Sequence, residues 1–145
     1  MTTARALVLD SNILIRAVLG KRVRDIIAGH SEQVVLLAPA EAFEEAGRHL
    51  PALLAKRGVD PGVAAAAVAE LPELVQLVEL KHYEHLREEA LERIAVRDPD
   101  DWPVVALALA TGAAVWTEDQ DFFGSGVATW TTDRVELCLR NAGGS

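Results

Sequence analysis

The sequence has little cysteine, few aromatic residues and fewer basic than acidic side chains, and these shortages exclude several classes of protein. Only one of its 145 residues is cysteine, Cys138, so the chain forms neither an internal disulfide nor a thiolate cluster around zinc. It carries 14 Lys and Arg against 22 Asp and Glu, a formal net charge of -8. Affinity for nucleic acid through bulk charge needs the opposite balance. If this chain handles nucleic acid, a cation must bridge the two.

The chain also lacks a long apolar segment and a Gly-rich phosphate-binding loop. The apolar run before Asp10 is too short for a signal peptide. Stretches such as Val104 to Ala110 fall far short of the roughly 20 apolar residues that span a bilayer. We therefore expect a cytoplasmic protein with no membrane partner, and we expect no nucleotide cofactor.

The composition that remains is typical of one globular domain. Half of the residues are hydrophobic and a quarter are charged, and no repeat, low-complexity tract or linker interrupts them. A chain of this length buries roughly 68–70% of its unfolded surface, which is enough for a single core. We predict one domain over residues 1–140 and a flexible tail over 141–145.

Short apolar runs alternate with helical patterns along the chain. The runs predict strands at residues 6–9, 34–37, 113–116 and 127–131, with 74–80 as a further strand or a helical segment. The helical patterns cover residues 13–27, a segment that starts at Pro39, residues 61–71, 82–96 and 102–111, and a last segment from Asp133. This alternation predicts an α/β fold, a three-layer sandwich whose mostly parallel central sheet is flanked by helices.

Acidic residues follow two of the predicted strands and begin two of the predicted helices. They are Asp10, Asp119, the cluster Glu41, Glu44 and Glu45, and the cluster Asp98, Asp100 and Asp101. All four places lie at the edge of a parallel sheet where ligands bind. Capping explains each helix-start cluster taken alone. Gathering four carboxylates costs repulsion unless a cation compensates, however, and hard oxygen ligands select Mg²⁺ or Mn²⁺.

Three of these segments resemble motifs of the PIN-domain ribonucleases, a family that includes the toxins of bacterial toxin–antitoxin pairs. The segments are LVLDSNILI at 7–15, DPDDWPVVALA at 98–108 and WTEDQDF at 116–122. They are similar to the family's opening strand with its first catalytic aspartate, to its third motif and to its closing T-x-D segment. The resemblance implies Asp10, Asp101 and Asp119 as catalytic carboxylates, with Asp121 as an auxiliary metal ligand.

The family's second motif matches least well. It usually has a Ser or Thr before a helix whose glutamate lies two turns in, and Ala38 stands at that first position. This departure puts a helix-capping contact in doubt more than the metal site. Counting along the helix favours Glu44 as the catalytic and metal-binding acid, with Glu41 and Glu45 as alternatives.

The resemblance implies a metal-dependent endoribonuclease that hydrolyses RNA phosphodiester bonds, and a role as the toxin of a toxin–antitoxin pair. The four acids would hold one or two Mg²⁺ or Mn²⁺ ions, which orient and deprotonate a water. Asn12 would orient Asp10 by a hydrogen bond, and Thr117 would hold the last loop. The resemblance further implies an antitoxin protein as partner and a homodimer.

Two other interpretations of the acids belong to different classes. A phosphotransfer enzyme also ends its first strand in Asp, but Asn12 and the presence of only three lysines count against it. The second alternative is a non-catalytic PIN-like interaction module whose acidic pocket binds a basic partner. The one dense basic run, Lys21, Arg22 and Arg24, fits a solvated helix face better than a phosphate contact.

Overall fold

The structure is a computed structural model that describes residues 5–94 and 98–143. Its sheet contains β1 (Arg5–Leu9), β2 (Val34–Pro39), β3 (Gln76–Val78), β4 (Ala114–Trp116) and β5 (Thr129–Trp130). Its α-helices are α1 (Ser11–Leu19), α2 (Lys21–His30), α3 (Ala40–Lys56), α4 (Pro61–Leu74), α5 (Arg87–Ile94), α6 (Trp102–Thr111) and α7 (Val135–Gly143). Short 3₁₀ turns lie at Leu80–His82, Glu84–Leu86, Pro99–Asp101 and Gln120–Phe122. No helix in these ranges is long and apolar enough to cross a bilayer.

The five strands form one sheet in the order β3-β2-β1-β4-β5, and every neighbouring pair is parallel. The predicted α/β sandwich is confirmed, and the sheet is wholly rather than mostly parallel. Strands buried on both faces read as continuous apolar runs, as in the Leu7-Val8-Leu9 segment of β1. The strand β1 lies at the centre, so its carboxyl end is surrounded by the ends of its neighbours.

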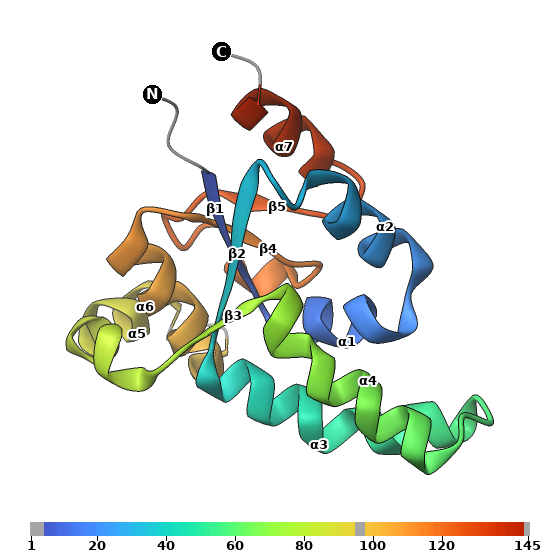
Figure 1. Ribbon diagram of the computed structural model, residues 1–145. Coiled ribbons are helices and arrows are strands. Elements are labelled where there is room, and N and C mark those ends of the chain that lie inside the picture. The colour runs from blue at the N-terminus through green and yellow to red at the C-terminus, as the bar shows by residue number, and fades with distance from the viewer. Residues whose placement is uncertain (1–4, 95–97, 144–145) are drawn as a thin grey trace.

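Helices cover both faces of the sheet (Figure 1). Leu7 and Leu9 face a core formed with α1, α2, α3, α4 and α7. Val8, which points the other way, packs with α5 and α6. Side chains of successive strand residues alternate between faces, so one short strand supplies both cores.

The helical segment predicted over residues 13–27 is two helices that meet at Gly20. The Gly20 N–H donates to the carbonyl of Arg16 at 2.6 Å. A Cβ at Gly20 would lie 2.9 Å from that oxygen, so the bend requires glycine. The break separates α1, which follows Asp10 directly, from α2.

The segment from residue 74 to 96 differs most from its prediction. The helix α4 continues to Leu74 and β3 covers only 76–78, while the helix predicted from His82 is two 3₁₀ turns followed by α5. Tyr83, between those turns, is completely buried, and this packing overrides the local helix propensity. In α5, Ala90 and Ile94 are buried. The predicted end of that helix, at 95–96, lies outside the described residues.

The C-terminal region also differs from its prediction. The strand predicted over 127–131 is limited to β5, and α7 begins at Val135. This helix continues through residues 141–143, which the sequence assigns to a tail, while 144–145 lie outside the described residues.

Candidate active site

The carboxylate of Asp10 lies at the carboxyl end of the central strand and is only 5% exposed. Its Oδ1 accepts a hydrogen bond of 2.9 Å from the N–H of Ile13, which caps α1, and its Oδ2 accepts one from the Thr117 hydroxyl. Burial raises the pKa of Asp10 to about 6 against the effect of these bonds, and the charges of Asp119 and Glu45 raise it further. Ionisation of this carboxyl group near neutral pH therefore costs free energy in the folded protein.

Strand register brings Thr117 to Asp10. Leu9 of β1 pairs with Trp116 of β4, so the next residues of the two strands emerge side by side. Thr117 is completely buried, and its oxygen also accepts the N–H of Asp119 at 2.9 Å. The Thr117 hydroxyl thus links the carboxylate of Asp10, after β1, to the backbone of Asp119, after β4.

Asp101 comes from the start of α6. The preceding 3₁₀ turn is capped by Asp98, whose Oδ1 accepts the Asp100 N–H at 3.0 Å. The Oδ2 atom of Asp101 is buried and has no hydrogen-bond partner in the described part of the chain. Burial, followed by the charges of Asp98, Asp119, Asp10 and Glu45, raises the pKa of Asp101 to about 7.

The helix α3 brings Glu45, rather than Glu44, to these aspartates. Glu41 and Glu45 line a small pocket of about 30 Å³ together with Asp10 and Asp101, here called the acid pocket. Positions four apart share a face of a helix, and Ala42 and Ala46 beside them are buried. Glu44 and Glu45 are both exposed, but Glu44 does not line this pocket, and only the charge of Glu45 acts on Asp10 and Asp101.

Asn12 does not make the hydrogen bond to Asp10 that the sequence predicts. Asn12 is exposed and lines a neighbouring groove, while the bonds to Asp10 come from Ile13 and Thr117. The side chain of Asp121 lies outside what the structure describes. Asp119, by contrast, raises the pKa values of both Asp10 and Asp101 through its charge.

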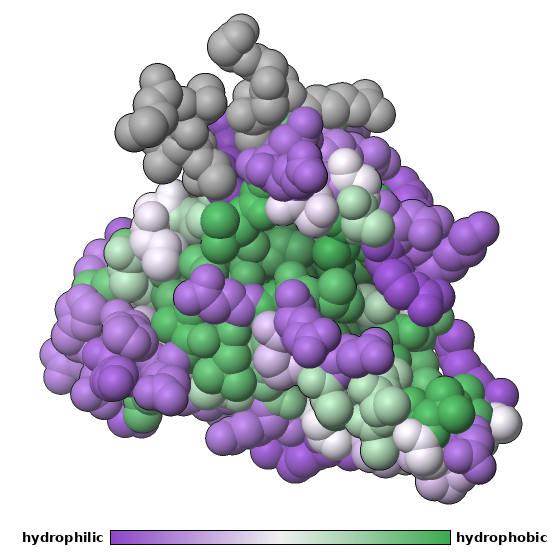
Figure 2. Space-filling model, in the orientation of Figure 1, coloured by the Kyte–Doolittle hydropathy of each residue, from purple (hydrophilic) through white to green (hydrophobic). Residues whose placement is uncertain are grey.

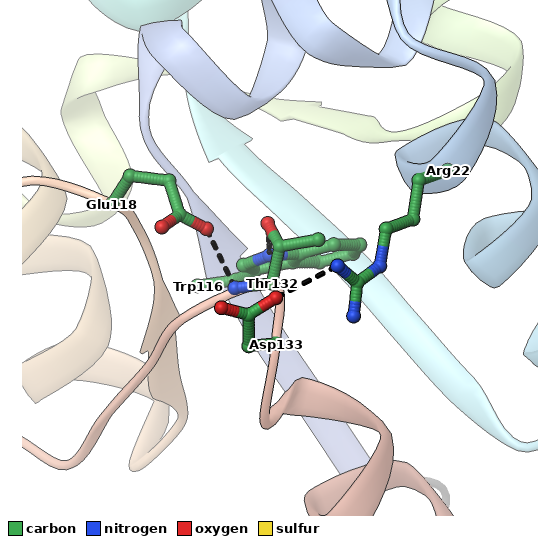
Figure 3. A network of polar contacts seen from close by, with 5 residues as sticks. All are labelled: Arg22, Trp116, Glu118, Thr132 and Asp133. Atoms are coloured by element: carbon green, nitrogen blue, oxygen red, sulfur yellow. Dashed lines mark hydrogen bonds and ion pairs between the residues drawn. The ribbon is translucent and has the colours of Figure 1, made fainter.

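A second polar network fixes the segment that follows β4 (Figure 3). Glu118 accepts the backbone N–H of Thr132 at 2.6 Å, and the indole of Trp116 donates to the Thr132 hydroxyl at 3.1 Å. Asp133 pairs with Arg22 of α2 at 2.7 Å. These contacts tie the residues just before Asp119 to Thr132, in the segment that leads into α7.

Tyr83 is a residue of the site that local sequence patterns do not reveal. Its hydroxyl donates to Glu41 and accepts the N–H of Ala40, the first residue of α3. Burial and the charge of Glu41 raise the pKa of this hydroxyl well above its usual range, so it stays protonated. The N-cap residue Pro39 has no capping side chain. Tyr83 therefore supplies the capping hydrogen bond that the family's Ser or Thr, replaced here by Ala38, would be expected to make.

The donor set fits a hard divalent cation. All the clustered ligands are carboxylate oxygens, which Mg²⁺ and Mn²⁺ prefer, and the unpaired Oδ2 of Asp101 offers a lone pair that nothing else uses. Within residues 5–94 and 98–143, no three His, Cys, Asp or Glu side chains are arranged as a complete metal site.

Comparison with known proteins agrees with the fold described above. The family model of the PIN domain matches residues 8–140. The fold is similar to that of PAE2754 from Pyrobaculum aerophilum, with a TM-score of 0.67 and 17% identity over 95% of this chain and 90% of that one. It is also similar to VapBC2 from Rickettsia felis bound to a DNA fragment from their promoter, with a TM-score of 0.63 and 14% identity over 87% and 98%. No curated protein matches the sequence.

The raised pKa values predict that charge removal stabilises the metal-free protein. Unfolded aspartate titrates near pH 3.9, so the folded state holds protons that the unfolded state loses between about pH 4 and 7. Stability therefore falls as pH rises through this window and levels off above it. We expect Asp101→Asn, in EDTA, to melt about 3 to 6 °C above the parent at pH 8 and together with it below pH 4. A variant that melts lower at pH 8 would make this carboxylate a structural group.

Loss of the Tyr83 hydroxyl should uncap α3. We expect Tyr83→Phe to lower the free energy of unfolding by about 1 to 2 kcal/mol in urea titrations, because an N–H and a carboxylate lose their partner. Adding Pro39→Ser, which places a capping hydroxyl at the N-cap, should restore part of the loss. An unchanged midpoint in Tyr83→Phe would contradict the capping role.

Proposed function

The chain belongs to the PIN-domain family, and from that premise we propose that it is a metal-dependent endoribonuclease that hydrolyses RNA phosphodiester bonds. One observation carries the proposal: the buried Asp10 and the half-buried Asp101 lie beside Glu45 and Asp119, and the pKa values of both aspartates lie far above the usual range. Such a cluster destabilises the folded chain unless a cation occupies it. Residues with strongly shifted pKa values cluster at functional sites.

We assign the binding of one or two Mg²⁺ or Mn²⁺ ions to Asp10, Glu45, Asp101 and Asp119. When bound, such ions supply a water of lowered pKa and charge stabilisation for the leaving oxygen. Thr117 holds the Asp10 carboxylate by its hydroxyl, and the N–H of Ile13 fixes the other oxygen. We keep Asp121 as an auxiliary ligand, because it follows Asp119 on the same loop.

Glu41 has a different role from Glu45 in this proposal. Both line the acid pocket, but the carboxylate of Glu41 already accepts the hydroxyl of Tyr83. A carboxylate held in this way keeps its orientation and bears a more diffuse charge. We therefore assign Glu41 to positioning α3. The metal-ligand role that the sequence analysis gave to Glu44 we assign to Glu45 alone.

We further propose that the protein is the toxin of a toxin–antitoxin pair and forms a homodimer. VapBC2, a similar fold, was solved on a DNA fragment from the promoter of both proteins. Several large apolar side chains are exposed, among them Val63, Leu74 and Leu77 at 61%, 47% and 40%. In Figure 2, hydrophobic residues gather over the middle of the face turned to the viewer, with hydrophilic residues around them. Surface of this kind is typical of protein interfaces, and the acidic pocket fits a basic side chain of an antitoxin.

Adjacent glutamates provide a matched test of the proposed metal site. We expect Glu45→Gln to abolish the heat of Mn²⁺ binding in calorimetry and to slow RNA cleavage by at least about a hundredfold, because removal of even a residue supporting a ligand costs 10- to 100-fold. The same change one residue earlier, Glu44→Gln, should leave both within about twofold of the parent.

The remaining outcomes separate the rival interpretations. Loss of binding in Glu44→Gln but not in Glu45→Gln would overturn our assignment of the second-motif acid. Mn²⁺ binding by the parent without cleavage of any RNA tested would favour a non-catalytic interaction module. No binding and no cleavage by the folded parent would overturn the proposed enzyme.

A further inference from the structure

A groove opens directly beside the acid pocket, between α1 and α3. It has a volume of about 440 Å³ and shares two lining residues, Ser11 and Glu45, with the acid pocket. A chain that lay in this groove would therefore reach the clustered carboxylates without crossing another element.

The wall formed by α3 carries the acid and the cations on one stripe. Arg48 lies three residues after Glu45, with His49 beside it, and Lys56 lies eight residues after Arg48. All of them line the groove, since residues three, four, seven, eight and eleven positions apart share a helix face. At a rise of about 1.5 Å per residue the stripe from Glu45 to Lys56 is about 16 Å long.

The charge of this groove is opposite to that of the whole chain. The chain carries a net charge of -8, yet the groove is lined by two permanent cations and one carboxylate. Among the described residues, neither Arg48 nor Lys56 makes an ion pair. His49 and Asn12 add hydrogen-bond donors to the same lining.

We propose that the α1–α3 groove holds the phosphodiester backbone of single-stranded RNA beside the cleavage site, with Arg48 and Lys56 each contacting a phosphate. The inference rests on the proposed function and names how its substrate is held. The helices α1 and α3 pack directly against each other, and we assign the groove along their contact to one strand rather than to a duplex. Phosphate contacts position the strand and carry no base specificity.

The test compares variants with equal loss of charge. The double variant Arg48→Gln with Lys56→Gln removes both groove cations. The single changes Arg48→Gln and Arg24→Gln form a matched pair, because Arg24 is exposed on α2 and does not line the groove. The substrate is a fluorescein-labelled single-stranded oligoribonucleotide, cleaved in Mn²⁺ at several NaCl concentrations.

Arg48→Gln should raise KM about five- to tenfold for oligonucleotides of different sequence and leave kcat within about twofold. The slope of log KM against log [NaCl] should fall by about 0.7 for each phosphate contact removed. The double variant should lose about twice as much slope, and Arg24→Gln should match the parent. A role in folding alone would not change this salt slope.

Each other outcome also decides the proposal. If the parent cleaves RNA and the double variant keeps the KM and the slope of Arg24→Gln, the groove proposal is overturned and the nuclease stands. If the parent cleaves nothing, fluorescence anisotropy in EDTA replaces KM: weaker RNA binding by the double variant than by Arg24→Gln supports the groove without the activity. Equal binding by all variants, no binding at all, or equal competition by duplex RNA overturns it.

Discussion

The structure depends on one buried carboxylate at the end of the central strand. Asp10 is nearly inaccessible to water, yet it caps α1 through Ile13 and holds the end of β4 through Thr117. The cost of burying the charge and the benefit of these two bonds oppose one another, and the raised pKa shows that the cost is larger. The other acids of the site add repulsion to the cost of burying this charge. A cation bound at this edge of the sheet would therefore stabilise the folded chain.

The register of the sheet brings the residues of the site together, although they lie far apart in the sequence. The pairing of Leu9 with Trp116 places residues 10 and 117 together although 106 residues separate them along the chain. The first turns of α3 follow β2 at this edge, and the turn before α6 lies there too, since Asp101 lines the same pocket as Asp10 and Glu45. The acids on α3 and α6 therefore need no direct contact with each other to share one pocket.

Sequence patterns were sufficient for the strand ends and insufficient for the helix phase. An apolar run that stops at an acid is a local signal for Asp10, and a local pattern also gives the cluster Asp98, Asp100 and Asp101 before an apolar helix. The choice of Asp101 within that cluster comes from the resemblance to the family's third motif. The choice between Glu44 and Glu45 depends on a rotation of about 100° per residue, which is set by how Ala42 and Ala46 pack. The long-range contact of Tyr83 with α3 has no local signal at all, and the capping role that Ala38 leaves open is filled from a distant turn.

The Tyr83 contact joins the two layers of the molecule. Its ring lies in the core formed with α5 and α6 and packs against Trp102 at 6.0 Å, with Arg87 over that indole at 5.2 Å. Its hydroxyl caps a helix whose own core lies on the opposite face of the sheet. Opening of either layer releases this polar bond, so we expect the two cores to open together in hydrogen exchange. A ligand that moves Trp102 at the surface has a physical route to the acid pocket.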